Sequence, residues 1–180
     1  MNRIAIPAAD ATPAASRPLL DAVQQQLGMV PNLMKMTGNS PAALEGYLAL
    51  NGAIGKGVLD VKTRERIALA TAEFNGCDYC LAAHSYIGKN MARLDDGEIA
   101  AARDYRAADA KAQAALRFAQ SVAAQRGQVK DADIAAVRAA GHDDAAIVEI
   151  VANVALNVLT NYLNNVAATE VDFPAAAQRG

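Results

Sequence analysis

Apolar residues recur three or four positions apart along most of this chain, which is the spacing of an α-helix. Capping residues such as Ser16, Ser40 and Asp60, together with prolines and glycines, mark where each apolar run begins and ends. They predict a turn near residues 30–34 and helices over residues 16–26, 41–55, 60–75, 77 to 88–90, 95–103, 108–125, 131–140 and 144–168. Strand signals are few, so the pattern predicts an all-α fold.

The chain shows no internal division. It has no linker-like tract, no low-complexity segment and no second copy of its cysteine motif. Residues 1–180 are therefore expected to form a single helical domain around one shared core. Pro7 and Pro13 interrupt the beginning of the chain, so residues 1–15 are expected to be an extended N-terminal arm.

Alanine dominates the composition, with 43 alanines among 180 residues and only 4% aromatic residues. Alanine favours helices but has little apolar surface to bury, so a monomer would have a thin core. Residues 108–125 and 144–168 carry apolar or small side chains on more than one helical face. We therefore expect a symmetric homo-oligomer in which residues 144–168 contribute to a subunit seam.

The charge of the chain bears on its partners and location. A net charge of −2 and a pI near 5.7 argue against a nucleic-acid partner or an anionic membrane surface. Residues 1–7 lack the long apolar stretch of a secretory signal, so a cytoplasmic location is expected.

Residues 144–168 are apolar enough to suggest a membrane span. Glu149 and five asparagines interrupt the segment, and such residues are costly in lipid, so no membrane role is expected. Four of the asparagines fall on one helical face: Asn153, Asn157, Asn161 and Asn164. We interpret this stripe as a polar face turned to water or to a subunit seam; the alternative is a stripe that lines an active-site pocket.

The candidate chemistry lies in one short segment. The only two cysteines, Cys77 and Cys80, stand beside His84, one of only two histidines. At about 100° per residue, Cys80 lies ~60° and His84 ~20° from Cys77, so all three share one helical face. In a reducing compartment a Cys-x-x-Cys is more often catalytic or metal-binding than a structural disulfide. Two thiols beside an imidazole suit thiolate redox chemistry.

Glu65 is the carboxylate expected to complete this group. Residues 75–76 predict the turn of a helical hairpin, with Glu65 ~15 Å behind the turn and His84 ~12 Å beyond it. Antiparallel packing would bring the two level, and a carboxylate beside an imidazole orients it as a base. We assign His84 to Cys80, four residues before it. A helix N-terminus instead favours a thiolate at Cys77 by roughly 0.3–1 kcal/mol, and spacing alone leaves both assignments open.

Other readings of these residues are weaker. His84 lies ~10 Å along the helix axis from Cys77, which is awkward for a tetrahedral ion, and no fourth ligand is evident, so no metal site is expected. Glu65, in a charged run, could also be a solvated or ion-paired residue. His142 is interpreted as part of a solvated loop before a helix. Three aromatic residues near the motif are interpreted as core or pocket wall: Phe74, Tyr79 and Tyr86.

The combined pattern resembles a known family. Thr63-Arg64-Glu65-Arg66-Ile67-Ala68-Leu69-Ala70 followed by Cys77-x-Tyr79-Cys80-x3-His84 is similar to the signature of the carboxymuconolactone decarboxylase and alkylhydroperoxidase D (AhpD-like) family. The pattern of a glutamate, two cysteines and a histidine at these spacings is far more specific than a bare Cys-x-x-Cys. Further segments resemble the peroxidase-related branch of this family: residues 30–33, 40–41, 161–164 and 169–174.

The resemblance implies an all-helical, cofactor-free peroxidase that acts on hydrogen or organic peroxides as a homotrimer or homohexamer. It places the general base on Glu65, the relay histidine on His84, the resolving cysteine on Cys77 and the cysteine that becomes a sulfenic acid on Cys80. The implied reductant is a dithiol such as dihydrolipoamide or a partner thiol protein. Some members carry a histidine just before the second cysteine, where this chain has Tyr79.

Two other functions fit part of the pattern. A protein disulfide reductase or redox adaptor would use the same Cys-x-x-Cys on a protein disulfide. A cofactor-free enzyme like carboxymuconolactone decarboxylase would keep its turnover without either thiol. A thiol-dependent peroxidase cycling between a Cys77/Cys80 dithiol and a disulfide is our main hypothesis.

Overall fold

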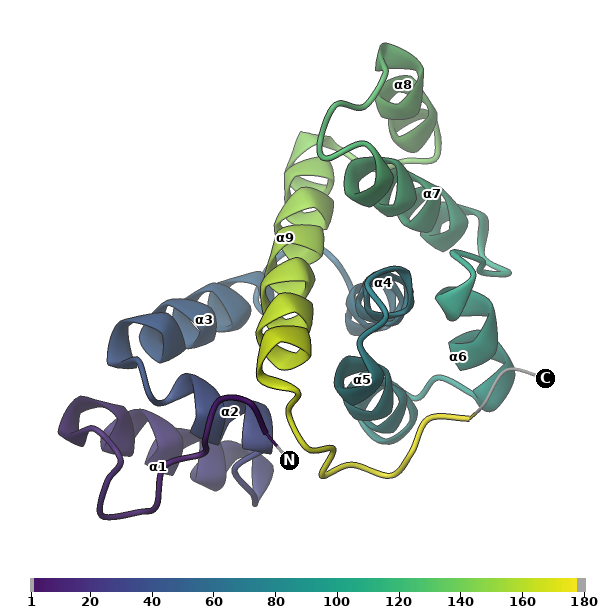
Figure 1. Ribbon diagram of the computed structural model, residues 1–180. Coiled ribbons are helices and arrows are strands. Elements are labelled where there is room, and N and C mark those ends of the chain that lie inside the picture. The colour runs from purple at the N-terminus through teal and green to yellow at the C-terminus, as the bar shows by residue number, and fades with distance from the viewer. Residues whose placement is uncertain (1, 178–180) are drawn as a thin grey trace.

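The computed structural model describes residues 2–177, and all regular secondary structure within them is helical (Figure 1). A short 3-10 helix, Ala14–Ser16, precedes the first α-helix. The α-helices are α1 (Arg17–Leu27), α2 (Asn32–Thr37), α3 (Pro41–Ile54), α4 (Val61–Phe74), α5 (Asp78–Asn90), α6 (Asp96–Arg103), α7 (Ala110–Ala124), α8 (Asp131–Ala139) and α9 (Asp144–Ala167). The predicted all-α class is confirmed.

Local capping explains most helix starts. The side chains of Ser40 and Asp60 accept hydrogen bonds from the backbone N–H three residues on, at 3.3 and 2.9 Å, as the sequence predicts. The same bond begins α6, α7 and α9 at Asp95, Asp109 and Asp143. The starts of α1, α2 and α8 have no such bond.

The predicted capping role of Ser16 is wrong because its hydroxyl has a tertiary partner. Ser16 is fully buried at the start of α1 and makes no capping bond. Its Oγ instead donates to the carbonyl of Gly38, 2.7 Å away, at the end of α2. A local pattern cannot foresee a partner 22 residues away.

Two helices organise the fold. The long helix α9 runs through the middle of the molecule, with α1 to α3 on one side and α4 to α7 on the other (Figure 1). It packs against α2, α3, α4, α5 and α7, while α4 packs against α5, α6, α7 and α9. One apolar cluster joins α4, α7 and α9 around Ile67, Leu116 and Ile150. A second surrounds the two cysteines and joins α1, α2, α3 and α5.

The N-terminal residues run along this framework. The backbone N–H of Arg3 donates to the carbonyl of Ala167, 2.6 Å away at the end of α9. A turn closes between Ala8 and Thr12, and the 3-10 helix follows it.

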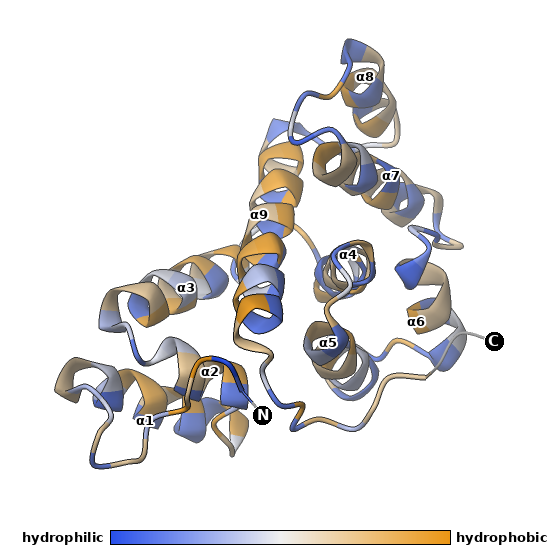
Figure 2. Cartoon of the chain, viewed as in Figure 1, coloured by the Kyte–Doolittle hydropathy of each residue, from blue (hydrophilic) through white to orange (hydrophobic). Residues whose placement is uncertain are grey.

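Helix α9 is a core helix with one apolar outer face. By length and composition it could cross a membrane, but half of its most apolar stretch is buried inside the molecule. Its asparagine stripe is buried too: each of Asn153, Asn157, Asn161 and Asn164 is at most 4% exposed. Blue bands on α9 in Figure 2 mark such polar positions between orange apolar ones. The interpretation of the stripe as a face turned to water or to a subunit seam is therefore wrong.

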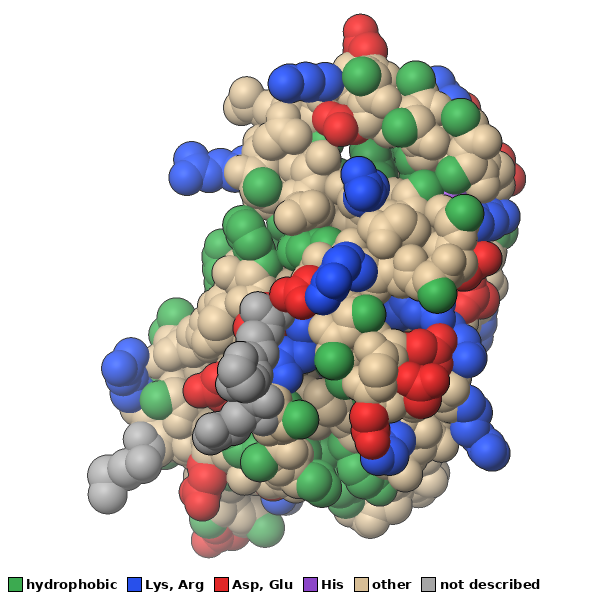
Figure 3. All heavy atoms as spheres, turned by 90° about the vertical axis from the view of Figure 1, so that its right-hand side faces the viewer, with side chains coloured by type: hydrophobic (Ala, Val, Ile, Leu, Met, Phe, Trp, Pro, Cys, Tyr) green, Lys and Arg blue, Asp and Glu red, His purple; other side chains and the backbone are tan. Residues whose placement is uncertain are grey.

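Charges of both signs are mixed on the surface. On the face shown in Figure 3, lysine and arginine side chains lie beside aspartate and glutamate side chains. Lys89 and Asp96 form an exposed ion pair at 2.8 Å, whereas Arg66, which is buried, pairs with Glu98 at 2.6 Å. This mixture agrees with the small net charge of −2.

Glu149, on α9, binds the segment that precedes α4. Its carboxylate accepts hydrogen bonds from the backbone N–H groups of Val58 and Leu59, at 2.9 and 3.0 Å. A Cβ atom at Gly57 would overlap this carboxylate, so a side chain there would displace it from both donors.

We therefore expect Gly57→Ala to lower the free energy of unfolding by about 1–3 kcal/mol, because hydrogen bonds to a charged acceptor are lost. Urea denaturation would measure the change. Gly52→Ala is the control for an added methyl group, since a Cβ at Gly52 meets no atom within 4 Å; because Gly52 lies inside α3, alanine should raise stability there by about 0.5–1 kcal/mol. A free energy of unfolding for Gly57→Ala equal to that of the unaltered protein would contradict this account of Glu149.

Candidate functional site

The hairpin of α4 and α5 sets the position of the cysteine motif. Gly76 has a φ of 60°, a left-handed conformation that glycine adopts without strain. The chain then reverses, and the N–H of Cys77 donates to the carbonyl of Ala72, 2.9 Å away. Cys77 is thereby the N-cap of α5, which confirms the Cys-x-x-Cys at the start of a helix.

Cys77 and Cys80 are joined by a disulfide in this structure, with their Cα atoms 5.3 Å apart. The Sγ atom of Cys77 also accepts a hydrogen bond from the N–H of Cys80, at 3.2 Å, in the manner of a capping side chain. The two residues are 0% and 2% exposed. The sulfur pair therefore lies inside the fold, below the molecular surface.

Glu65 and His84 meet across the hairpin, as the antiparallel geometry predicts. The distance from His84 Nδ1 to Glu65 Oε2 is 2.8 Å, and the side chains are 22% and 15% exposed. An ionised carboxylate can only accept, so Nδ1 carries the hydrogen and Nε2 is the nitrogen that can take up a proton. Of the two alternative interpretations of Glu65, a solvated or an ion-paired residue, the solvated one is wrong, because the side chain is 15% exposed and contacts His84.

Tyr47 is a third group in this neighbourhood that the sequence does not reveal. It lies on α3, and burial together with the nearby charge of Glu65 raises its pKa to about 12. Its phenol therefore stays protonated beside the carboxylate. Nothing in the spacing of the motif points to a residue 18 positions ahead of Glu65 on another helix.

The buried asparagines of α9 also reach the motif. The side-chain amide of Asn164 donates to Cys80 Sγ at 3.3 Å. One turn earlier, Asn161 accepts a hydrogen bond from the side chain of Asn75 in the hairpin turn, at 2.8 Å. The structure thus favours the alternative reading of the stripe, in which it lines the site.

Tyr79, between the two cysteines, holds the C-terminal segment against α5. Its hydroxyl donates to Asp172 at 2.8 Å and accepts from the N–H of Leu33 at 3.1 Å. The ring of Phe173 packs edge-on against it, with centroids 5.8 Å apart. Burial, assisted by Asp172, raises the pKa of Tyr79 well above its ordinary value. The phenol therefore keeps its proton and donates it in the hydrogen bond to Asp172.

The aromatic residues around the motif divide into two kinds. Tyr79 is 4% exposed, which confirms that it belongs to the core. Phe74 and Tyr86 are 51% and 44% exposed, so they do not belong to the core, and their alternative interpretation as pocket wall stays a prediction. Tyr86 still packs against the ring of Phe173, with ring centroids 5.9 Å apart.

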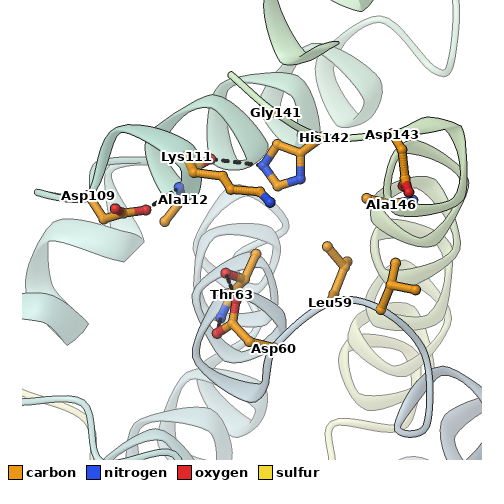
Figure 4. Close-up of a pocket in the computed structure, with 11 residues that line it drawn as sticks. Leu59, Asp60, Thr63, Asp109, Lys111, Ala112, Gly141, His142, Asp143 and Ala146 are labelled. Carbon is orange, nitrogen blue, oxygen red and sulfur yellow. Dashed lines mark hydrogen bonds between the residues drawn. The ribbon is translucent and has the colours of Figure 1, made fainter. Parts of the chain in front are cut away.

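His142 is buried, and its interpretation as a solvated loop residue is wrong. It is 5% exposed, and its Nε2 lies 3.0 Å from the carbonyl of Lys111. A carbonyl only accepts, so Nε2 is the donor and ties the start of α9 to the start of α7. The residue lines a cavity of about 360 Å³ at the N-terminal ends of α4, α7 and α9 (Figure 4). None of the predicted site residues lines this cavity: Glu65, Cys77, Cys80 and His84.

Comparison with known proteins agrees with the motif. Residues 41–124 match the sequence profile of the carboxymuconolactone decarboxylase family. This region is therefore similar to that family. It contains all four predicted site residues: Glu65, Cys77, Cys80 and His84.

Solved structures extend the likeness to nearly the whole chain. The alkylhydroperoxidase AhpD core protein of Ralstonia eutropha JMP134, an uncharacterized peroxidase-related protein, is 28% identical, with a TM-score of 0.85 over 95% of this chain and 92% of that one. An uncharacterized peroxidase-related protein of Silicibacter sp. TM1040 is 25% identical, with a TM-score of 0.82 over 94% of this chain and 91% of that one. The fold is therefore AhpD-like, and the disulfide-bonded Cys-x-x-Cys supports a redox role at the level of the family.

Two further matches are more limited. The debrominase Bmp8, solved in complex with 2,3,4-tribromopyrrole, is 19% identical, with a TM-score of 0.77 over 94% of this chain and 91% of that one. That likeness concerns the fold alone. A 46-residue stretch is 50% identical to an uncharacterized protein of Haemophilus influenzae and spans 25% of this chain and 41% of that protein.

Proposed function

We propose that this protein is a thiol-dependent peroxidase that reduces hydrogen or organic peroxides. The Cys80 thiolate attacks a peroxide oxygen and the O–O bond breaks, leaving a sulfenic acid on Cys80 and an alcohol or water. The Cys77 thiol then attacks the sulfenic sulfur, which forms the disulfide and releases water. An external dithiol reduces the disulfide and becomes a disulfide itself.

The observation that carries the proposal is the presence of a disulfide and an acid–base pair on one hairpin. The Cys77–Cys80 disulfide is the oxidised end of such a cycle. The Glu65–His84 pair, at 2.8 Å, supplies an oriented base on the same two helices. Both steps of the cycle require proton movement, from the attacking thiol and to the leaving oxygen. The similarity to peroxidase-related proteins supports the same reading.

Burial of the sulfurs favours a small oxidant over a protein disulfide. A protein partner would have to bring its own sulfur in line with a sulfur that is 0% or 2% exposed. A peroxide is small enough to reach such a site through modest side-chain movement. We therefore rank peroxide reduction above a redox-adaptor role.

The proposed reductant is a dithiol such as dihydrolipoamide or a thiol protein, and no bound cofactor enters the proposed cycle. The proposed location, where such reductants occur, is the cytoplasm. Of these two reductants the small dithiol is favoured, because a thiol protein would meet the same obstacle at the buried sulfurs as a protein disulfide.

The test is to compare oxidants on the fully reduced protein. We expect micromolar hydrogen or organic peroxide to form the Cys77–Cys80 disulfide within seconds, and dihydrolipoamide to sustain peroxide consumption. A protein disulfide at the same concentration should react far more slowly. Peroxide that is inert at millimolar levels, with rapid oxidation by a protein disulfide, would support the adaptor role instead.

The protein is also proposed to assemble as a homotrimer or homohexamer. Five large apolar residues of α9 are at least 41% exposed: Val148, Val151, Leu159, Tyr162 and Val166. At 100° per residue they fall within roughly 80° of one another, so they form one continuous outer stripe. A stripe of this kind is typical of an interface.

We expect light scattering at micromolar concentration to report a trimeric or hexameric mass. Val166→Glu should shift the protein toward monomer, because a charge would be buried in the seam. Met91→Glu is the control, since Met91 is equally exposed, at 61% against 62%, but lies at the end of α5. A monomeric mass for the unaltered protein would refute the assembly.

A further inference from the structure

We propose that Asn164 is a catalytic residue that makes Cys80, and not Cys77, the sulfur attacked by the oxidant. Its side-chain amide donates to the Cys80 sulfur and stabilises the negative charge that this sulfur carries as a thiolate. The inference rests on the proposed dithiol cycle, but it concerns which sulfur ionises and can be tested without peroxide.

In the contact between Asn164 and Cys80, the asparagine is the donor and the sulfur is the acceptor. Asn164 Nδ2 lies 3.3 Å from Cys80 Sγ, and both residues are 2% exposed. A disulfide sulfur carries no hydrogen and can only accept, so the nitrogen of the amide must face it. The amide therefore already points a donor at the atom that becomes the thiolate after reduction.

The two sulfurs have different donors. Cys77 Sγ accepts the backbone N–H of Cys80 at the N-terminus of α5, an interaction that the helix itself provides. Cys80 Sγ has a donor from another helix, α9. Without Asn164, the helix terminus would favour ionisation of Cys77. With it, a buried charge on Cys80 gains a charge-assisted hydrogen bond in a site of low dielectric constant.

A second asparagine keeps α9 in register with the motif. Asn161 accepts a hydrogen bond at 2.8 Å from Asn75, which lies in the turn just before Cys77. Asn161 is 0% exposed, so the accepting end of this partly buried bond is shielded from water. It anchors α9 to the hairpin one turn before Asn164, which holds the Asn164 amide opposite Cys80.

The experiment measures alkylation of the reduced protein by iodoacetamide across pH, with mass spectrometry to assign each cysteine. We expect Asn164→Ala to slow alkylation of Cys80 at pH 7 roughly tenfold and to make Cys77 the faster-reacting cysteine. Asn164→Asp keeps the shape of the side chain but replaces the donor by an acceptor, and it should slow Cys80 at least as much.

Asn165→Ala is the matched control. Asn165 also donates an amide hydrogen from α9, but to the carbonyl of Asn75 at the surface. Its alkylation rates should stay within about twofold of the unaltered protein. Circular dichroism of all variants reports folding, and the isosteric Asn164→Asp guards against a packing defect in Asn164→Ala.

Unchanged rates and an unchanged order of the two cysteines in Asn164→Asp would overturn the proposal. Suppose that Cys77 becomes the faster-alkylated cysteine in the Asn164 variants, while the unaltered protein does not react with peroxide. The assignment of Asn164 then stands and the peroxidase proposal fails. The two ideas therefore fail separately.

Discussion

Cys80→Ser is expected to lose peroxide reduction to the uncatalysed background, a fall of at least roughly 10³-fold. Cys77→Ser is expected to react once and stop, with a sulfenic acid accumulating on Cys80. Cys77 and Cys80 are the only cysteines in the chain, so no other thiol of the chain can condense with that sulfenic acid. The difference between the variants follows from assigning attack to Cys80 and resolution to Cys77.

A sulfenic-acid probe and mass spectrometry would check this on each variant after one equivalent of peroxide. The helix N-terminus at Cys77 predicts the opposite order, because the cap position also favours a thiolate. A sulfenic acid on Cys77 in Cys80→Ser would mean that the roles are reversed. Continued turnover in a variant without either thiol would instead favour a decarboxylase-like enzyme.

Glu65→Gln and His84→Ala are each expected to lower the rate of oxidation by peroxide roughly 10²–10³-fold. Glu65 holds His84 by the 2.8 Å contact to Nδ1, so the two act as one unit. The double variant should therefore be little slower than either single variant. Stopped-flow measurement of disulfide formation would give the four rates.

Glu45→Gln provides the control for loss of a carboxylate. Glu45 lies exposed on α3, and its substitution should change the rate by less than about twofold. The double variant could instead be slower by the product of the two single fold-decreases in the rate of disulfide formation. Glu65 and His84 would then act independently, contrary to the relay.

Local interactions account for what the sequence predicted well. The helix boundaries near Ser40 and Asp60 were foreseeable because a cap and its partner lie three residues apart. The meeting of Glu65 and His84 was foreseeable for a related reason: a three-residue connection forces α4 and α5 to lie side by side, so distances from the turn can be compared. The expected homo-oligomer stays a prediction.

Long-range contacts account for the corrections. Ser16 bonds to Gly38 instead of capping its own helix, and His142 bonds to the backbone at Lys111 instead of facing water. Tyr79 is oriented by Leu33 and Asp172, which are 46 and 93 residues away in sequence. No local pattern encodes such partners.

The sequence by itself determined the all-α class and the four motif residues, because helical period, capping and turn length act over only a few residues. Only the tertiary structure decided which polar residues serve the motif. A stripe of asparagines on a helix looks the same whether it faces water or a buried sulfur. The packing of α9 against α5 turned that stripe inward and brought the Asn164 amide to 3.3 Å from the Cys80 sulfur, 84 residues away in sequence.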